Sequence, residues 1–310
     1  MGAEDPPDAG RDSFSSPPES DAIRVEDVSF RYRGAPRDAV DSVGLSVARG
    51  EIVGLLGPSG AGKSTLQRVL TRQLRDYRGQ VSVLGRSLPS WGQEYFEAIG
   101  VGFELPNHYL KFTAYENLRF FASMYRKACQ DPMELMARVG LERAAHARVE
   151  TFSKGMRMRL NFVRAIQHDP EILYLDEPTA GLDPVNAGIV KGLIAELRSR
   201  GKTVVLTTHN MHDVDELCDR VSFLIGGRLV AMDAPAVLKA RYGRRVVRVR
   251  HGADHREEQT EFPLDGLADN PGFLALLRAG NIRSIHSQEA TLDQVFVDVT
   301  GTSLDGVAEP

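Results

Sequence analysis

The sequence predicts an α/β fold built on a parallel β-sheet. A glycine-rich segment, 57–65, lies between a short apolar strand that ends at Leu56 and a stretch with helical spacing. Two more apolar runs, 171–175 and 203–207, are separated by a helical pattern that begins at Asp183-Pro184. A strand, a helix and a second strand in succession favour parallel pairing of the two strands.

Length and composition limit the class of protein. The 310 residues are 42% hydrophobic and 26% charged, which is enough apolar material for a packed core in roughly one or two domains. The formal net charge of -4 argues against a chain that mainly binds nucleic acid. No run approaches the roughly 18 consecutive apolar residues of a membrane-spanning helix, so we expect the chain not to cross a bilayer itself.

The beginning of the chain differs from the rest in composition. Residues 1–20 are rich in Pro, Asp, Ser and Gly and lack the apolar central region of a secretory signal, so a disordered tail is predicted. Cys129 and Cys218 lie far apart in the sequence without Cys-x-x-Cys spacing, and we expect both thiols to be free.

The remaining segments have recognisable periodicities. From Ile23 to Leu56, stretches rich in Val and Ile alternate with turn residues and are predicted to be strands at a sheet edge. From Thr113 to His168 the pattern is mainly helical, and residues 113–116 have the spacing of a capping box.

After about Arg241 the composition shifts, which predicts a small appended module. Valine and arginine alternate with period two in 247–250, so we expect the arginines on the solvated face of a strand rather than in a basic docking patch.

The segment from Gly57 to Thr65 is predicted to bind phosphate. Glycines let the backbone N–H groups approach phosphate oxygens, Lys63 reaches the β and γ phosphates, and the Ser64 hydroxyl is a ligand for Mg2+. The predicted nucleotide-binding residues of this loop are Gly57, Pro58, Ser59, Gly60, Ala61, Gly62, Lys63, Ser64 and Thr65. Such a loop alone does not distinguish a kinase, a GTPase, a helicase or a transporter ATPase.

The apolar strand 171–175 is followed by two adjacent carboxylates, Asp176 and Glu177. Successive strand residues point to different sides, so the two carboxylates can have different partners. Asp176 suits the Mg2+ shell, and Glu177 can polarise the attacking water as a general base. The alternative is that the pair only terminates a strand.

The order of these and further motifs resembles an ATP-binding cassette subunit over roughly residues 22–242. Residues 152–156 occupy the signature position, 180–183 resemble the D-loop, and His209 follows two threonines as the family's switch histidine does. In addition, Tyr32 falls where the family places an aromatic that stacks on adenine, and Glu104 falls at the Q-loop.

This resemblance implies a specific domain organisation. The expected fold is α/β, a P-loop NTPase cassette with a mixed-sheet core at 21–242 and a helical subdomain at about 105–168. A small α+β module is expected at 243–310.

The resemblance also implies an active site shared by two cassettes. Ser153 and the Gly155 backbone would bind the γ phosphate of a nucleotide on the opposite subunit, and Asp183 would bridge the interface. The implied catalytic residues are Glu177 and His209, the implied Mg2+ ligands are Ser64, Glu104 and Asp176, and Tyr32, Ser153, Gly155 and Asp183 join the loop in binding ATP. A dimer, expected to be a homodimer, is therefore part of the mechanism.

Taken one at a time, these motifs have simpler explanations. Ser153 can be only a helix cap, Tyr32 only a strand aromatic, and His209 with His212 can suggest a metal site. Their joint order favours the cassette.

Two positions depart from the family pattern. Glu104 replaces the usual glutamine and brings a charged oxygen near Mg2+ and the γ phosphate, where we expect it to act as a Mg2+-linked sensor. Met156 stands where glutamine is usual and Lys154 replaces a glycine, a form that resembles some bacterial export subunits.

The segment 291–301 is similar to the tail of bacterial drug and polysaccharide export ATPase subunits. Its helical apolar spacing also predicts packing of Leu292, Val295, Phe296 and Val299 onto its own domain. The resemblance implies an ATPase that powers export of a hydrophobic or amphipathic compound through an ABC-2-type membrane permease on a separate chain. The expected location is the cytoplasmic face of a bacterial membrane, without a nucleic-acid partner.

In such systems the helical region between Glu104 and Ser153 receives coupling helices of the permease. Its aromatic residues are Phe112, Tyr115, Phe120, Phe121 and Tyr125, and core packing is the expected use for most of them. The alternatives to an exporter are an import ATPase subunit, a soluble cassette ATPase that acts on ribosomes or DNA, and a regulatory cassette that binds ATP without hydrolysing it.

Overall fold

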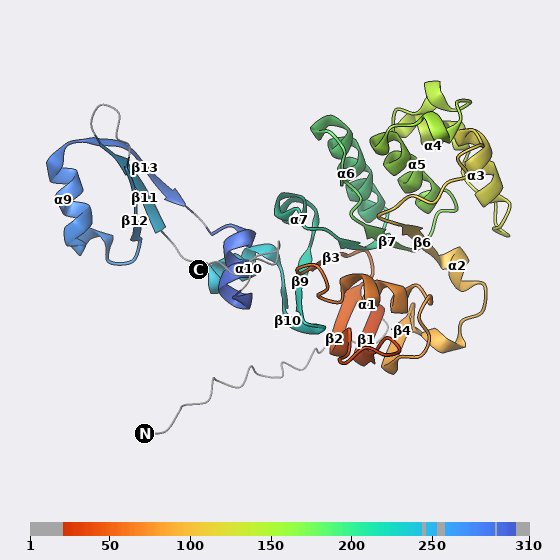
Figure 1. Ribbon diagram of the computed structural model, residues 1–310, viewed down its shortest axis with the longest axis horizontal. Coiled ribbons are helices and arrows are strands. Elements are labelled where there is room, and N and C mark those ends of the chain that lie inside the picture. Colours follow the sequence, from red (N-terminus) through yellow and green to blue (C-terminus); the bar gives the residue numbers. More distant parts are fainter. Residues whose placement is uncertain (1–20, 244–245, 253–257, 289, 302–310) are drawn as a thin grey trace.

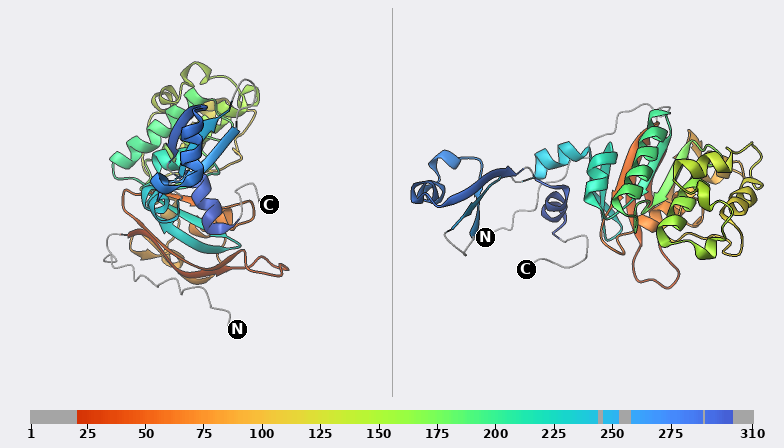
Figure 2. Two further views of the ribbon diagram at one scale, coloured as in Figure 1. Left: turned by 90° about the vertical axis from the view of Figure 1, so that its left-hand side faces the viewer. Right: turned by 90° about the horizontal axis from the view of Figure 1, so that it is seen from above.

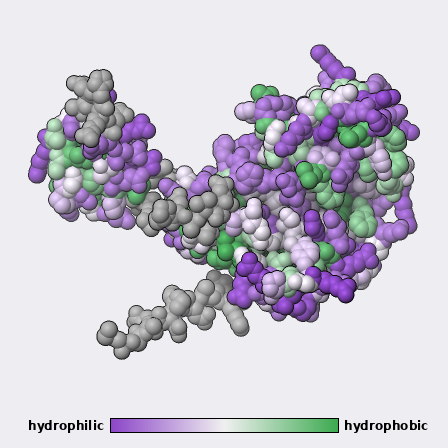
Figure 3. Space-filling model, viewed as in Figure 1, coloured by the Kyte–Doolittle hydropathy of each residue, from purple (hydrophilic) through white to green (hydrophobic). Residues whose placement is uncertain are grey.

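The computed structural model describes residues 21–243, 246–252, 258–288 and 290–301. The predicted disordered tail, 1–20, lies outside the described residues. A large α/β body carries a small three-stranded module at one end, and the two parts are separated in Figure 1 and in the right-hand view of Figure 2. Hydrophilic side chains dominate the face shown in Figure 3, where apolar surface is confined to scattered patches.

A six-stranded mixed sheet forms the centre of the α/β body. Its strand order is β10 (Arg228–Asp233), β9 (Arg220–Ile225), β3 (Ile52–Leu56), β8 (Thr203–Thr207), β7 (Ile172–Asp176) and β6 (Ile99–Gly102). Only β10 pairs antiparallel with its neighbour, and the other four pairs are parallel. The predicted strand–helix–strand unit is confirmed, because β7 and β8 are parallel neighbours connected through α6 (Pro184–Ser199).

The prediction that the strands of 23–56 lie at a sheet edge is correct for β2 (Val40–Ala48), which is the first strand of its sheet, and wrong for the other two strands. β3 lies in the interior of the sheet, between β9 and β8, and all five of its residues are buried. A short, continuously apolar run without polar alternation is typical of a parallel strand covered on both faces. The β1 strand (Asp21–Phe30) is likewise an interior strand of a second sheet.

This second sheet is antiparallel and has the order β2 (Val40–Ala48), β1, β4 (Arg78–Val83) and β5 (Arg86–Ser87). It packs toward one face of the central sheet, with α1 (Lys63–Leu70) between them (Figure 1). Val53 and Leu55 of β3 belong to this core, whereas Ile52 and Leu56 belong to the core on the other face. The alternation follows from the two-residue period of a strand.

Helices cover the other side and one end of the sheet. They are α2 (Tyr95–Ala98), α3 (Ala114–Ala122), α4 (Pro132–Arg138), α5 (Lys154–Ile166), α6 and α7 (Met211–Leu217), with short 3-10 turns at Leu88–Ser90, Glu142–Ala144 and Val149–Thr151. The predicted capping box is confirmed: the Thr113 amide donates to Glu116 Oε2 at 2.8 Å, and the Glu116 amide donates to Thr113 Oγ1 at 3.1 Å.

The C-terminal part begins with α8 (Pro235–Tyr242). The three-stranded antiparallel sheet follows, with the order β12 (Glu258–Pro263), β11 (Val246–His251) and β13 (Ile282–Gln288), together with a turn at Leu267–Asp269 and α9 (Pro271–Ala279). Val247 and Val249 are buried in its small core, while Arg250 is exposed and Arg248 pairs with Glu261. The predicted solvated arginine face of this strand is confirmed.

The last helix, α10 (Leu292–Thr300), returns to the α/β body. Leu292, Val295 and Phe296 are buried, and the Phe296 ring meets Phe223 of β9 edge-on at 5.1 Å. The predicted packing of this segment is therefore confirmed. The three-stranded module is inserted between α8 and α10, two helices that contact each other. The proposed boundary at residue 243 stays a prediction.

Other features of the chain concern its thiols and its helices. Both cysteines are free, as expected, with Cys218 buried and Cys129 half-buried. Over the ranges that the structure describes, none of the helices combines the length and the apolar character needed to cross a membrane.

We expect Phe296→Ala to destabilise the protein by about 3–5 kcal/mol, because it removes a fully buried ring and leaves a cavity beneath β9. The measurement is the urea unfolding midpoint followed by circular dichroism. The matched control is Phe96→Ala, since the Phe96 ring is 45% exposed and its loss should cost about 1 kcal/mol or less. Equal losses in the two variants would show that α10 does not support the α/β body.

Candidate functional site

The candidate site lies where β3, β7 and β8 end. β3 leads into the loop 57–62, β7 into Asp176 and Glu177, and β8 into the segment 207–209. Because parallel strands end at the same edge of their sheet, three motifs that are far apart in the sequence meet there. Ligands of open α/β sheets bind at this edge.

The glycine-rich loop wraps around the side chain of Lys63. Lys63 Nζ donates hydrogen bonds to the carbonyl oxygens of Gly57 at 2.5 Å and Pro58 at 3.1 Å. Burial lowers the pKa of Lys63, whereas the negative charges of Glu177, Asp176 and Glu104 oppose that shift. The lysine therefore lies in the field of all three carboxylates that the sequence singled out.

Two glycines of the loop have different steric surroundings. Gly62 has φ +107°, and a Cβ atom there would lie 2.4 Å from the Ala39 carbonyl oxygen. Gly60 has φ +80°, but a Cβ atom there would meet nothing within 4 Å. Gly62 is thus required by both its conformation and its close packing, and Gly60 by its conformation alone.

Asp176 and Glu177 have different hydrogen-bond partners within the chain. Thr207 Oγ1, across the parallel pairing from Asp176, donates to Asp176 Oδ1. Glu177 Oε1 lies 2.8 Å from Nδ1 of His209, and Glu177 Oε2 accepts from Thr208 Oγ1 at 3.2 Å. The pair does more than terminate a strand.

Glu177 has a strained backbone. Its φ is +49°, in the left-handed region that residues other than glycine rarely adopt, at a cost of about 1–3 kcal/mol. The strain turns the chain directly after Asp176, which allows the two neighbouring carboxylates to reach different sides of the site.

A cavity of about 380 Å³ lies beside the loop, and Ser64, Glu104 and Asp176 all line it. A hydroxyl and two carboxylates are hard oxygen donors, which Mg2+ prefers, and Mg2+ commonly takes one or two carboxylates together with phosphate oxygens and water. The donor set therefore fits Mg2+ bound together with a phosphate ligand. Within the described ranges, no group of three or more His, Cys, Asp and Glu side chains is arranged to hold a metal ion by itself, and His209 and His212 form no such group.

Tyr32 lies next to α1. Its hydroxyl is 3.3 Å from Thr65 Oγ1, its ring contacts Phe30 edge-on at 5.0 Å, and it is 38% exposed. The ring therefore has a free portion beside the phosphate loop, where an aromatic base can stack on it.

The signature residues lie away from this cavity. Ser153 is the N-cap of α5, and its hydroxyl accepts a hydrogen bond from the Met156 amide at 3.2 Å. Gly155, in the first turn of α5, faces Leu182 of the D-loop. Ser153 and Gly155 are not among the residues that line the cavity beside Ser64, Glu104 and Asp176.

Asp183 is the N-cap of α6 and accepts from the amides of Val185 at 3.1 Å and Asn186 at 3.0 Å. Hydrogen bonds from Asn186, through its side chain and its backbone, lower the pKa of Asp183. Like Ser153, it does not line the cavity.

Several residues that build the site were missed by the sequence analysis. Thr207 and Thr208 were noted only as neighbours of His209, yet their hydroxyls hold both carboxylates. Their position at the end of an apolar strand adjacent to the acidic one was a usable signal. Asn161 Nδ2 donates to the Phe103 carbonyl at 2.7 Å and so anchors the segment that carries Glu104, a contact between distant segments that no sequence pattern indicated.

Comparison with known proteins agrees with this geometry. A family model described as ABC transporter matches residues 40–180, and one described as fluoroquinolone efflux ABC transporter C-terminal domain matches residues 245–289. A fluoroquinolones export ATP-binding protein of Mycobacterium tuberculosis is 54% identical over 92% of this chain and 95% of that protein. A Nod factor export ATP-binding protein I of Neorhizobium galegae is 33% identical over 92% of this chain and 86% of that protein.

Solved structures are similar as well. A dimeric ATP-binding cassette in a post-hydrolysis state bound to ADP and Pi superimposes with a TM-score of 0.63 and 25% identity, over 68% of this chain and 98% of that chain. An ATP-binding subunit of an ABC transporter superimposes with a TM-score of 0.65 and 28% identity, over 72% of this chain and 93% of that chain.

We expect Gly62→Ala to be more destabilising than Gly60→Ala. Both variants place an L-residue at positive φ, which costs about 1–2 kcal/mol, but only the new methyl group at position 62 collides with a backbone oxygen. The measurement is the thermal midpoint without nucleotide. Equal midpoints for the two variants would contradict the packing of the loop against Ala39.

Proposed function

The chain belongs to the ATP-binding cassette family of transporter ATPases, and we propose that it powers the export of a hydrophobic or amphipathic compound through a membrane permease on a separate chain. The proposal of export rests on the relatives, whose names describe export ATP-binding proteins for fluoroquinolones and for Nod factors. No relative named above is described as an importer or as a protein acting on ribosomes or DNA, so those alternatives have less support.

The observation that carries the hydrolytic function is the meeting of Lys63, Asp176, Glu177 and His209 at one sheet edge. In the proposed site the loop amides from Gly57 to Thr65 surround the phosphates, and Lys63 leaves the loop carbonyls to bind the β and γ phosphates. Tyr32 stacks on the adenine.

Glu177 is the proposed general base. Hydrogen bonds from Thr208 and His209 fix the orientation of its carboxylate, so that one oxygen can accept a proton from the attacking water. His209 is 71% exposed, which leaves its other ring nitrogen accessible to a γ phosphate. These contacts disfavour a regulatory cassette that binds ATP without hydrolysing it.

Ser64, Asp176 and Glu104 are the proposed residues around Mg2+, because they line one cavity. When bound, Mg2+ would neutralise negative charge on the phosphates. Thr207 holds Asp176 in place for this task.

The second half of the site comes from a second cassette, and we expect a homodimer. Ser153, Gly155 and Asp183 lie away from the chain's own cavity, and both serine and aspartate begin helices. The N-terminus of α5 presents backbone N–H groups and a positive dipole end, which suit a γ phosphate supplied by the partner cassette.

The permease is proposed to dock on the helical region between Glu104 and Ser153, at the cytoplasmic face of the membrane. Phe121 and Tyr125 line an open groove of about 640 Å³ there, whereas Tyr115 packs against the main core. The aromatic cluster is therefore divided between core packing and a surface that a partner can reach. We further propose that this permease is of the ABC-2 type.

Specific ATPase activity of the purified chain, measured against protein concentration with Mg2+ present, tests the proposed function. Activity per molecule that rises with concentration supports a transient homodimer with composite sites. Activity per molecule that is independent of concentration would contradict the shared site. An absence of activity at every concentration would show that the chain does not hydrolyse ATP by itself.

We expect Glu177→Gln to lower ATP turnover by a factor of about 10²–10⁴, which is the usual contribution of a general base, while ATP binding persists. Turnover is measured by phosphate release and binding by equilibrium dialysis. Glu134→Gln, at an exposed position on α4, is the matched control and should leave turnover unchanged. An unchanged rate in Glu177→Gln would exclude Glu177 from catalysis.

We expect Glu104→Gln to raise the Mg2+ concentration for half-maximal turnover by about tenfold, because it replaces a charged ligand with a neutral one at a cost of about 1.4 kcal/mol. Titration of Mg2+ at saturating ATP measures the effect. If both the Mg2+ dependence and the maximal turnover are unchanged, Glu104 is not a Mg2+-linked sensor.

A further inference from the structure

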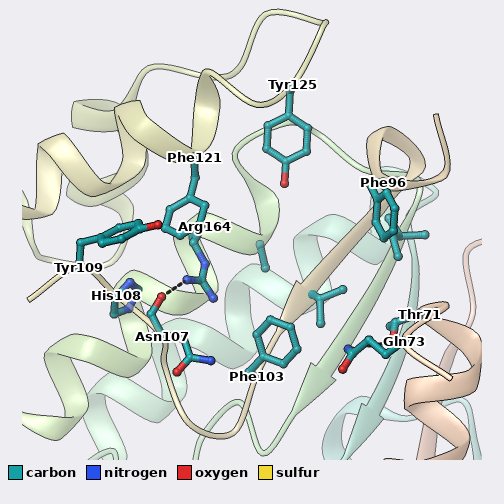
Figure 4. Close-up of a pocket in the computed structure, with 13 residues that line it drawn as sticks. Thr71, Gln73, Phe96, Phe103, Asn107, His108, Tyr109, Phe121, Tyr125 and Arg164 are labelled. Carbon is teal, nitrogen blue, oxygen red and sulfur yellow. Dashed lines mark hydrogen bonds between the residues drawn. The ribbon is translucent and has the colours of Figure 1, made fainter. Parts of the chain in front are cut away.

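A buried arginine dominates the groove that Phe121 and Tyr125 line. In Figure 4 the Arg164 side chain points from α5 into the middle of the groove, among Phe103, Asn107 and Phe121. It is only 7% exposed, and its guanidinium lies 4.7 Å from the centre of the Phe121 ring. Burial lowers the pKa of Arg164, which shows how poorly this place accommodates an uncompensated cation.

No carboxylate of the described residues compensates this charge. Arg164 Nη1 donates to the Asn107 carbonyl at 2.6 Å, Arg164 Nη2 donates to Asn161 Oδ1 at 2.8 Å, and both acceptors are neutral. Within the described ranges Arg164 has no ion pair. A guanidinium has five N–H donors in a planar fork, so donors remain for another acceptor.

Arg164 is also the one lining residue of this groove that is charged at neutral pH. The other titratable lining groups are His108, Tyr109 and Tyr125. Burial lowers the pKa of His108 to about 4, so its ring is neutral, and Tyr125 has a pKa raised to about 12, mainly by burial. The groove is thus apolar with a single positive centre at its base.

The apolar surface continues beyond the groove. Large hydrophobic side chains at its rim and nearby are more than a third exposed, and they are Phe96, Leu105, Tyr109, Leu110, Phe112 and Met124. Exposed large apolar side chains that gather around a groove mark an interaction site. A polypeptide with apolar side chains can cover this rim.

From this charge and shape we infer that the groove accepts a polypeptide segment that inserts one Asp or Glu carboxylate against Arg164, with apolar residues on either side. The inference rests on the proposed function, since it gives the chemistry of the permease segment that docks here. A carboxylate matches the guanidinium fork through two parallel hydrogen bonds, which a neutral or basic side chain does not reproduce.

Arg164 also connects the groove to the phosphate site. It holds the Asn107 carbonyl, and Asn161 holds the Phe103 carbonyl, so two residues of α5 fix both ends of the segment that carries Glu104. A carboxylate that binds the remaining donors of Arg164 would pull on the guanidinium that holds the Asn107 carbonyl and Asn161. Binding in the groove would therefore change the position of Glu104 and of the first turn of α5, which carries the signature residues.

The test is selection of peptide-display library members on the full chain, with counter-selection on Phe121→Ala to remove peptides that bind elsewhere. We expect a consensus with one Asp or Glu between apolar residues. Exchanging that residue for Asn or Gln in a selected peptide should weaken binding to the wild-type chain at least about tenfold in fluorescence anisotropy. Binding to Arg164→Gln should show no such difference.

Arg164→Gln also disturbs the hydrogen bonds to Asn107 and Asn161. If that variant does not fold, the exchange within the peptide decides the test. A consensus without an acidic residue, the absence of any groove-dependent consensus, or equal affinity of the acidic and amide peptides would each overturn the inference. Mg2+-ATP turnover of the same preparation separates the two proposals. If the chain turns over ATP but selects no acidic consensus, only the inference of a carboxylate partner is rejected. If it selects an acidic consensus but shows no turnover, only the proposal of hydrolysis by the chain alone is rejected.

Discussion

The register of the central parallel sheet is the constraint on which the rest of the site depends. β3, β7 and β8 run side by side, and Asp176 pairs across from Thr207. This register places the glycine-rich loop, the acidic pair and His209 at one edge of the sheet. A shift of one residue between β7 and β8 would reverse the side chains that face each other and separate Glu177 from His209.

Backbone strain at Glu177 and two threonine hydroxyls orient the carboxylates that the register brings to this edge. Glu177 takes up a left-handed conformation, and the adjacent threonines each hold one carboxylate. Such strain persists only where the surrounding structure overdetermines it, as four parallel strand pairs and two buried cores do here. The rigid sheet thus allows two neighbouring acids to differ in orientation and in partner.

Helix α5 connects the groove to the segment that carries Glu104. Its first turn carries Ser153 and Gly155, and its last two turns hold the segment 103–107 through Asn161 and Arg164. A rigid element that touches both the groove and the Q-loop segment can convert movement at one into movement at the other. The three-stranded module is inserted before α10, whose Phe296 is packed against β9.

The sequence by itself determined the identity and order of the motifs. The phosphate loop and the acidic pair are local patterns whose chemistry follows from residue type and spacing, and the signature was identified through its resemblance to the cassette family. The sequence also predicted the parallel β7–α6–β8 unit and the capping box of α3, because both depend on neighbouring residues. Only the tertiary structure placed β3 inside the sheet, brought Thr207 and Thr208 to the carboxylates and directed Arg164 into an apolar groove. These features arise between segments distant in sequence, and the periodicity of one segment carries no information about which other segment packs against it.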